Sequence, residues 1–438
     1  MSALIIIDLQ KEFFEPDGIM GKKHFSFNFY KYKYDRMLAY CIQNNINIYW
    51  IQSDYSDAED DIGYKTHNNK QRPCCYKNTQ KHELIEYVQD KVNNGCGTVV
   101  AKRYYSCFHK NDLLQKLADT NTKILYFAGL TITTCVSKSI IDAQLNGFDC
   151  NLLEDLVITD RQFIYSHTEQ RAFTALEKLR ITITNSNSIL NCWGEGDVRI
   201  VKFENFNTAN SDIFVLLQNT IKFYKMYNRS IEVPRLVAIQ SIEGVLGQPH
   251  YRHPNDIEPP NEEMSPLLRN LMQNVELLCN YQGLNHALIQ LYRDGSDNIS
   301  SHSDKTLDLD LNTPIFNVSF GCTRSMVLIN KTNKEIRERI VMNDSTILVF
   351  GLTTNKKWTH EIKKASIIVG ERISITFRRV NTFISPVDGI IRGQGSKNKT
   401  LDDNYKGSVV RDDMLTAFIE ENNNPEFNWQ DVYGEGFC

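Results

Sequence analysis

The sequence predicts two folds in succession: an α/β domain with a doubly wound parallel sheet, then a β-rich double-stranded β-helix, or jelly roll. Three observations lead to this prediction. The chain has 438 residues, which is too long for one ordinary core. Apolar strands alternate with helical patterns up to about residue 190, and short strands follow one another from residue 287. We therefore expect domains at 1–191 and 192–383, and a polar tail with an aromatic anchor at 384–438.

The first half reads as parallel strands with helices between them. Strands are expected at 4–7, 46–52, 98–101, 123–128 and 151–153, and helices at 112–118 and 135–146. The run at 4–7 is hydrophobic without interruption, as in strands buried on both faces. Sites of such sheets lie beyond the carboxyl ends of the strands. The polar residues that follow those ends are therefore the candidates: Asp8, Asp54, Lys102 and Cys135.

Three of these residues could form a nucleophilic site. Cys135 opens a predicted helix, where unpaired N–H groups and the helix dipole would stabilise a thiolate, so we expect its pKa to lie below the usual value of about 8.5. Lys102 would add positive charge, and the Asp8 carboxylate could accept the thiol proton. The alternative is structural: Asp8 as a helix cap, Lys102 as a surface cation and Cys135 as a small buried hydrophobic residue.

The segments around these positions resemble the isochorismatase-like cysteine hydrolases, which include nicotinamidases, over about residues 1–185. The segments are Ile6-Ile-Asp8-Leu-Gln-Lys-Glu-Phe-Phe14, Val99-Val-Ala-Lys102-Arg-Tyr-Tyr-Ser106 and Gly129-Leu-Thr-Ile-Thr-Thr-Cys135-Val136. The resemblance implies that Asp8 moves the thiol proton, that Lys102 holds both charges, and that Cys135 attacks the carbonyl of a small amide-type substrate. It also implies a cis Leu130–Thr131 peptide and an oxyanion hole from the N–H groups of Thr131 and Cys135.

One departure from that family concerns metal. Nicotinamidases carry a metal site with Asp-x-His after the second strand, whereas this chain has Ser53-Asp54-Tyr55-Ser56, and the next histidine is His67. We therefore expect no zinc in the hydrolase domain and do not expect nicotinamide as substrate. True isochorismatases lack the cysteine, so isochorismate is also disfavoured.

The second half changes to short strands after a polar joint at 185–196. A strand and an amphipathic helix near 214–224 are expected first, followed by strands at 288–292, 315–320, 325–329, 346–350 and 372–378. His302 and Asp304 are two residues apart, so on a strand both side chains leave the same face. A lone pair of this kind is weak evidence for a metal. A third imidazole from another strand would complete a two-His, one-carboxylate set, which suits Fe(II) that must also bind O₂ and a keto acid.

The ordered run of motifs resembles the AlkB family of Fe(II)/2-oxoglutarate dioxygenases over about residues 233–380. It comprises Asn285-His-Ala-Leu-Ile-Gln290-Leu-Tyr292, His302-Ser-Asp304, Pro314-Ile-Phe-Asn-Val-Ser-Phe-Gly321, Trp358-Thr-His360 and the pair Arg372 and Arg378. The resemblance implies that iron is held by His302, Asp304 and His360. It implies that 2-oxoglutarate is contacted by Gln290, Tyr292, Arg372, Ser374 and Arg378, although the family usually has Asn at the position of Gln290. Arg suits this role because it binds carboxylates through two hydrogen bonds.

The substrates implied by the resemblance are nucleic-acid bases, flipped into the pocket and dealkylated. A substrate lid is implied at 249–266, with Tyr251 and His253 as lining candidates; ordinary loop residues are the alternative. Thr306 stands where DNA-repair members commonly carry an acidic residue that reads the base edge. The net charge of −4 provides no global positive field for nucleic acid. Oxidation of a protein side chain or metabolite, or a binding module with one decayed site, remain alternatives.

Composition bears on location and on the tail. Eleven scattered cysteines without a CxxC pair indicate a reducing compartment, and the chain has no basic leader and no apolar run of membrane-spanning length. We expect a cytosolic or nuclear protein without membrane contact; abundant Asn, Ile, Lys and Tyr indicate an AT-rich genome, such as that of a protist or large DNA virus. The segment 389–405 is expected to be mobile. Phe427, Trp429, Tyr433 and Phe437 should anchor the tail, with partner binding as the alternative.

Overall fold

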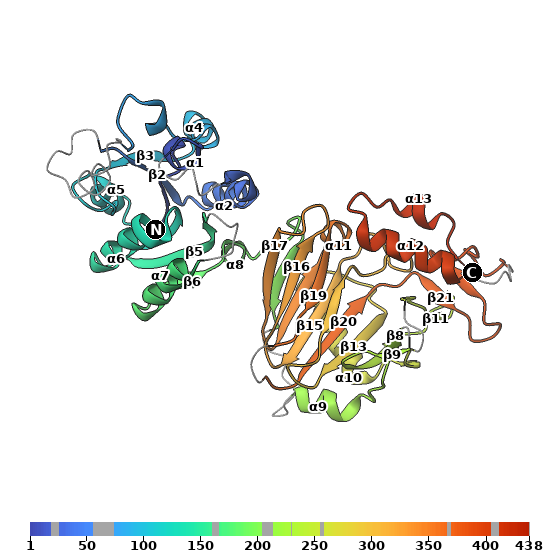
Figure 1. Cartoon of the computed structure of the whole chain (residues 1–438). Helices are drawn as coiled ribbons and strands as arrows, with labels where there is room; N and C mark the ends of the chain where they lie inside the picture. Colours follow the sequence, from blue (N-terminus) through green and yellow to red (C-terminus); the bar gives the residue numbers. More distant parts are fainter. Residues whose placement is uncertain are drawn as a thin grey trace. The chain divides into compact units, whose positions relative to one another are not determined.

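The computed structural model describes the whole chain except residues 19–25, 56–73, 160–165, 204–212, 229, 255–257, 366–368, 404–410 and 438. The chain forms two compact units, Met1–Leu190 and Asn191–Cys438 (Figure 1). Each unit has its own hydrophobic core. The tail belongs to the second unit. No helix among the described residues is long and apolar enough to span a membrane.

The first unit is built on a six-stranded sheet whose pairings are all parallel. Its strands are β1 (Ser2–Ile7), β2 (Asn47–Ser53), β3 (Thr98–Lys102), β4 (Ile124–Gly129), β5 (Asp149–Val157) and β6 (Thr182–Thr184), in the order β3-β2-β1-β4-β5-β6. Side chains of β1 alternate between two cores, with Ile5 in one and Ile6 in the other. Burial on both faces explains the unbroken apolar run, and the doubly wound parallel sheet is confirmed.

Helices and helical turns cover this sheet. They are α1 (Lys11–Phe14), η2 (Phe27–Phe29), α2 (Lys31–Gln43), η3 (Gln80–His82), α4 (Glu86–Asn93), α5 (Leu113–Asp119), η4 (Ile132–Val136), α6 (Ser137–Leu145), α7 (His167–Lys178) and α8 (Ser186–Leu190). The start of α7 has a local cause, because Ser166 and Glu169 form a reciprocal capping box. The expected helix at 135–146 is α6 preceded by the π-helical turn η4.

The second unit contains two larger sheets. The strands of the seven-stranded sheet, in spatial order, are β12 (Asn261–Glu263), β10 (Leu236–Ser241), β13 (His286–Tyr292), β20 (Arg372–Arg378), β15 (Ile315–Gly321), β18 (Thr346–Phe350) and β7 (Val198–Lys202). The four-stranded sheet contains β14 (Ile299–His302), β19 (Trp358–Ile362), β16 (Arg324–Asn330) and β17 (Arg337–Met342). Side chains from β16 and β18 share one core cluster. Two such sheets fit the expected jelly roll.

The remaining elements cover or extend these sheets. They are α9 (Ile213–Thr220), β8 (Tyr227–Asn228), β9 (Ile231–Glu232), β11 (Gln248–Pro249), α10 (Pro266–Cys279), α11 (Leu352–Lys357), β21 (Thr382–Ile384), β22 (Ile391–Gly393), α12 (Arg411–Asn423) and α13 (Trp429–Tyr433). Ser265 caps α10, and Pro266 occupies its first turn, where a missing N–H costs nothing. Both α9 and α10 pack on the core of the seven-stranded sheet.

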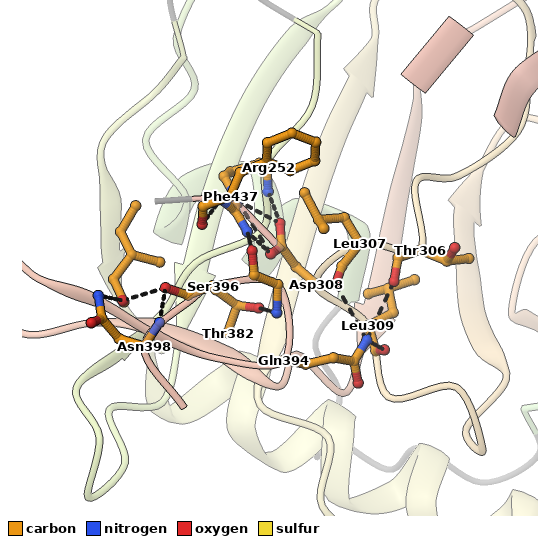
Figure 2. A network of polar contacts seen from close by, with 12 residues as sticks. Arg252, Thr306, Leu307, Asp308, Leu309, Thr382, Gln394, Ser396, Asn398 and Phe437 are labelled. Carbon is orange, nitrogen blue, oxygen red and sulfur yellow. Dashed lines mark hydrogen bonds and ion pairs between the residues drawn. The ribbon is translucent and has the colours of Figure 1, made fainter. Parts of the chain in front are cut away.

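The tail is packed where the sequence suggested mobility. β22 pairs with β21, and Ser396 and Asn398 are buried, so the expectation of a mobile 389–405 segment is wrong for the part up to Asn398. Figure 2 shows the cause: Arg252 binds the Asp308 carboxylate and also donates to the carbonyl of Gly395, 2.7 Å away. Polar contacts that composition does not reveal hold this segment. The four tail aromatics pack with Leu307 and α12 in one cluster.

Two candidate active sites

Asp8, Lys102 and Cys135 meet at one edge of the parallel sheet. Asp8 follows β1, Lys102 ends β3, and Cys135 lies on η4 after β4. The strand order changes direction between β1 and β4, which is the switch point where such sheets bind ligands. Gly129 ends β4 at a φ of +104°, and a Cβ there would lie 2.2 Å from the Ile7 carbonyl oxygen, so this close approach requires glycine.

Lys102 is at the centre of this group. Its Nζ lies 3.0 Å from the Asp8 carboxylate and 3.4 Å from the Cys135 Sγ. It also donates to Ser53 Oγ at 2.7 Å, and that hydroxyl donates to Asp8 Oδ1 at 2.8 Å. Sequence reasoning missed Ser53, although it directly precedes Asp54. All four side chains are buried, so the ammonium and the carboxylate neutralise each other away from water.

The expected low pKa of Cys135 is wrong. Burial, followed by the charge of Asp8, raises the pKa of Cys135 to about 12, and Lys102 only partly opposes this. Cys135 sits within the π-helical turn, two residues before α6, and is 7% exposed. The resting group is therefore a thiol, and attack requires that its proton be transferred as the bond forms.

Two backbone features were expected at this site. The Leu130–Thr131 peptide is cis, as expected. Thr131 also begins the turn that carries Cys135, and its carbonyl accepts from the N–H of Val136 at 3.1 Å. The oxyanion hole formed by the N–H groups of Thr131 and Cys135 stays a prediction.

Asp54 is the residue of the first unit that corresponds to the aspartate of the Asp-x-His metal site. Its N–H donates to the Lys102 carbonyl at 2.9 Å, and His67 lies outside the described residues. The structure shows a further histidine that interacts electrostatically with Asp54: His82, whose Nε2 is buried without a hydrogen-bond partner. Burial lowers the pKa of His82, and the charge of Asp54 opposes that shift. Sequence reasoning missed this histidine because it lies 28 positions after Asp54.

His302, Asp304 and His360 meet in the second unit because of strand register. β14 ends at His302, which lies opposite His360 on β19, and Asp304 follows two residues later in an irregular segment. Asp304 Oδ1 lies 3.8 Å from His302 Nε2 and 3.9 Å from His360 Nε2. All three ligand atoms lie within 4.8 Å of one another. Among the described residues, this is the one group of three or more His, Cys, Asp or Glu side chains arranged to hold a metal.

Electrostatics prepares these groups for a divalent cation. Burial lowers the pKa of both imidazoles, that of His360 to about 3, so both are neutral and can donate a lone pair. The His302 Nδ1 lies 2.8 Å from the Ser300 carbonyl, which places the proton there and leaves Nε2 free. Burial alone would raise the pKa of Asp304, but the positive charge of Arg378, whose Nη2 lies 2.7 Å from Oδ2, holds it well below its usual range. The donor set therefore fits iron.

The two arginines of β20 lie at opposite ends of the strand. Arg378 donates from Nη2 to Asp304 Oδ2 at 2.7 Å and faces the ring of Tyr251 at 4.5 Å. Arg372 is fully buried and donates to Ser319 Oγ at 2.9 Å, while its Nε and Nη1 have no hydrogen-bond partner. A buried guanidinium with two unused nitrogens fits a ligand carboxylate. Burial lowers the pKa of Arg372 to about 10.

The predicted cofactor residues line one cavity of about 740 Å³, except Arg372, which lies behind its wall. Gln290, Tyr292, Ser374 and Arg378 are in the lining. Tyr292 donates to Gln290 Oε1 at 3.3 Å. Sequence reasoning missed Asn317, whose Nδ2 donates to both Ser374 and Thr376 and whose Oδ1 accepts from Arg372. In the sequence, Asn317 is one polar residue within a predicted strand, and nothing else in the sequence indicates its role.

Two of the three lid candidates also line this cavity. Tyr251 and His253 are in the lining, and the Tyr251 hydroxyl accepts from the Lys305 N–H at 3.0 Å. Thr306 is not in the lining, because its N–H and hydroxyl both donate to Glu421 of α12. The structure thus turns Thr306 toward the tail.

Comparison with known proteins divides the chain in the same way. The isochorismatase domain family matches residues 2–187, and the 2OG-Fe(II) oxygenase superfamily matches residues 201–378. The DNA oxidative demethylase ALKBH2 of Bos taurus is 30% identical over 122 residues, 26% of this chain and 44% of that protein. The human alpha-ketoglutarate-dependent dioxygenase alkB homolog 3 is 30% identical over 129 residues, 28% of this chain and 45% of that protein. The chain thus spans less than half the length of these relatives.

Solved structures also align with the first unit. A pyrazinamidase/nicotinamidase from Streptococcus mutans is 21% identical, with a TM-score of 0.36, covering 42% of this chain and all of that one. A Pyrococcus horikoshii pyrazinamidase in complex with zinc is 21% identical, with a TM-score of 0.34 and coverage of 42% and 98%. With the two family matches, the site geometry leads to one conclusion: the chain is a fusion of an isochorismatase-like hydrolase domain and an AlkB-like 2OG-Fe(II) oxygenase domain, both from enzyme families.

Proposed function

We propose that this chain is a bifunctional enzyme that oxidatively dealkylates nucleic-acid bases in one domain and hydrolyses a small amide in the other. The observation that carries the first activity is the cavity that brings His302, Asp304 and His360 together, with the Nε and Nη1 of the buried Arg372 left without hydrogen-bond partners behind its wall. The second activity is supported by the contact of Lys102 with both Asp8 and Cys135. The proposed domains are 1–191 and 192–383, with the tail at 384–438.

In the hydrolase site, the Cys135 thiol attacks the amide carbonyl and its proton passes to Asp8. The N–H groups of Thr131 and Cys135 receive the charge that develops on the carbonyl oxygen. Asp8 returns the proton to the leaving nitrogen, so that an amine departs and a thioacyl enzyme remains. Water then hydrolyses the thioacyl bond with Asp8 as base, which releases the acid and restores the thiol. Lys102 stays protonated and holds the carboxylate in place. Zinc forms no part of this proposal.

In the oxygenase site, His302, Asp304 and His360 would hold Fe(II), and Arg372 would bind the distal carboxylate of 2-oxoglutarate. Gln290, Tyr292 and Ser374 would contact the same co-substrate. Arg378 orients Asp304 through one carboxylate oxygen, and its Nη1, which has no partner, remains for the co-substrate. Bound iron supplies the coupling of 2-oxoglutarate decarboxylation to hydroxylation of a substrate C–H bond.

The overall reaction balances on an N-methyl base. The base, O₂ and 2-oxoglutarate give the N-hydroxymethyl base, succinate and CO₂. The hydroxymethyl group then leaves as formaldehyde, and the proton from its hydroxyl returns to the ring nitrogen. The substrate class is supported by the names of the two relatives, a DNA oxidative demethylase and an alkB homologue. A cytosolic or nuclear location would give access to such substrates.

The test of the oxygenase is succinate formation with three separate substrate pools. The full chain is supplied with Fe(II), 2-oxoglutarate and O₂, together with N-methylated oligonucleotides, proteins or small metabolites. We expect succinate and formaldehyde in equal amounts from the oligonucleotide pool, and neither from Asp304→Ala. Substrate-dependent succinate from the protein or metabolite pool alone would replace the base assignment with one of the two rival substrates.

The hydrolase is tested with a panel of small amides in the absence of added iron. Release of ammonia or amine should disappear in Cys135→Ala and persist in Asp304→Ala. If Cys135→Ala releases as much product as the original chain, Cys135 is not the nucleophile.

A further inference from the structure

The tail contributes a wall to the oxygenase cavity. The oxygenase family match ends at residue 378, whereas α12 spans Arg411–Asn423. Its cavity-lining side chains are Leu415, Phe418, Ile419, Asn422 and Asn423. These positions follow the spacing i, i+3, i+4, i+7 and i+8, so they form one face of the helix. Ile419 is 56% exposed although it is apolar, which leaves hydrophobic surface facing the cavity.

The other side of α12 packs against residues 302–307, the segment that carries His302 and Asp304 and is called here the metal-ligand segment. Glu421 is buried, and its carboxylate accepts from the Thr306 N–H at 2.9 Å and from the Tyr433 hydroxyl at 2.5 Å. Lys331 donates to the Glu421 carbonyl at 2.7 Å. The tail holds the same segment a second time, because Gln394 donates to the Leu307 carbonyl at 3.3 Å (Figure 2). These contacts fix the position of the cavity-lining face of α12 relative to Asp304.

Asn422 has a fixed orientation within this face. Its Oδ1 accepts from the Ser303 N–H at 2.8 Å and from Lys305 Nζ at 3.4 Å. Because both partners are donors, the oxygen must face them and the amide nitrogen must point the other way. Among the described residues, Nδ2 makes no hydrogen bond. A hydrogen-bond donor is thus available in the cavity wall, beside the residue that lies between His302 and Asp304.

The charges around the cavity suit a neutral substrate. Arg235 and Lys305 line it as cations, in addition to Arg378. The carboxylates among its described lining residues are Asp304 and Glu232. Asp304 is paired with Arg378, and Glu232 is paired with Lys225 at 2.8 Å. A cationic alkylated base would therefore meet two cations and no uncommitted carboxylate within the described wall.

We propose that α12 reads the substrate, with Asn422 Nδ2 donating to a carbonyl oxygen and Phe418 and Ile419 contacting the flat apolar face. This inference rests on the proposed function and narrows its substrate class. The preferred substrates are neutral bases that carry carbonyl groups beside the alkylated nitrogen, such as N3-methylated thymine or uracil. Bases that become cationic on methylation, such as N1-methylated adenine, are disfavoured.

The test compares two oligonucleotides that differ in one base, N3-methylthymine or N1-methyladenine. The full chain with Fe(II), 2-oxoglutarate and O₂ is assayed for kcat/KM on each by formaldehyde release and by mass. We expect the original chain to prefer the neutral base by at least about 10-fold, the scale of one missing hydrogen bond beside an unfavourable charge. Asn422→Asp keeps the acceptor for Ser303 and Lys305, but it removes the donor and adds a negative charge. The preference ratio should therefore fall by about 10-fold or more in this variant.

The matched control is Asn428→Asp. Asn428 caps α13, outside the cavity lining, and aspartate caps a helix equally well. This variant should keep the original ratio, which separates a local contact from a general effect of charge. A preference for the cationic base, or an equal ratio in Asn422→Asp and the original chain, would overturn the inference while leaving base dealkylation in place. Turnover of neither oligonucleotide, with succinate from another pool, would overturn both.

Discussion

The two sites differ in how completely the chain satisfies its own buried charges. In the hydrolase site, the Lys102 ammonium contacts the Asp8 carboxylate, the Ser53 hydroxyl and the Cys135 thiol. In the oxygenase site, Arg372 Nε and Nη1, Arg378 Nη1 and His360 Nδ1 are buried without hydrogen-bond partners. Both groups are shielded from water, so the difference is one of partners and not of exposure.

This difference teaches what each site needs from outside the chain. Buried polar groups are normally paired, and an unpaired group is costly. The hydrolase triad is joined by its own contacts before any substrate arrives, with Asp8 Oδ2 held by its ion pair with Lys102 and by no hydrogen bond from the described residues, which suits a reaction carried by protein side chains. The oxygenase site keeps donors unused, which suits a site that is completed by a metal and a dicarboxylate.

The largest expected effect is the separate loss of each activity. His302→Ala, Asp304→Ala or His360→Ala should reduce 2-oxoglutarate turnover by more than about 100-fold, because each removes one of three ligands. Amide hydrolysis should be unchanged in all three, and Cys135→Ala should give the opposite pattern. Succinate and amine release measured on the same preparations check this. Joint loss of both activities in a folded variant would mean that the sites are not independent.

The next effect separates proton transfer from thiol acidity. The charge of Asp8 raises the pKa of Cys135, so Asp8→Asn should lower that pKa and speed alkylation by iodoacetamide at neutral pH several-fold. Amide hydrolysis should fall by more than about 100-fold in the same variant, because no carboxylate remains to move the proton. Peptide mapping after brief labelling measures the first quantity.

Lys102→Met is the opposing control. Lys102 lowers the pKa of Cys135, so its loss should raise that pKa and slow alkylation. In the original chain, alkylation of Cys135 should increase with pH up to its pKa of about 12. Fast labelling of Cys135 at pH 7, relative to Cys150 or Cys279, would contradict the buried-thiol description.

A smaller effect is expected from the shape of the cation in the oxygenase site. Arg372→Lys keeps the charge but loses the planar pair of donors, so the KM for 2-oxoglutarate should rise about 10-fold, or ~1.4 kcal/mol. Arg337→Lys on β17 is the matched control and should leave that KM unchanged. Equal KM values for Arg372→Lys and the original chain would place the carboxylate elsewhere.

The smallest effect should come from the partner of Arg372. Ser319→Ala removes the 2.9 Å hydrogen bond that orients Arg372 Nη2, while Asn317 remains at 3.4 Å. The KM for 2-oxoglutarate should rise two- to five-fold, about 0.5–1 kcal/mol, with kcat little changed. A change as large as that of Arg372→Lys would mean that Ser319 itself contacts the co-substrate.

The parallel sheet could be predicted because its pattern is local. The strand at 4–7 is β1, and the polar residues after the strands do meet at one edge. The meeting of His302 with His360 depends on the register of β14 and β19, neither of which was predicted as a strand. The roles of His302 and His360 were predicted from family motifs and not from a strand pattern, because both strands are short and carry polar residues.

The features of the two sites that could not be predicted depend on contacts between residues far apart in the sequence. Nothing in the sequence of Asn422 indicates that its side chain lies against Ser303, 119 positions earlier. The pKa of Cys135 also failed as a local prediction, because burial and the charge of Asp8 outweigh the effects of the turn and of Lys102. Such quantities follow from tertiary packing, which motif spacing does not describe.

The most direct test of the contrast between the two sites is the binding of 2-oxoglutarate by calorimetry. The full chain is titrated with 2-oxoglutarate after loading with Mn(II), which does not support turnover, and again in the presence of a chelator. We expect binding at one site per chain with Mn(II), at least about 10-fold weaker binding with chelator or in Asp304→Ala, and the same loss in Arg372→Lys. Binding that is equally tight with and without metal, or absent in both, would contradict an oxygenase site completed by a metal and a dicarboxylate.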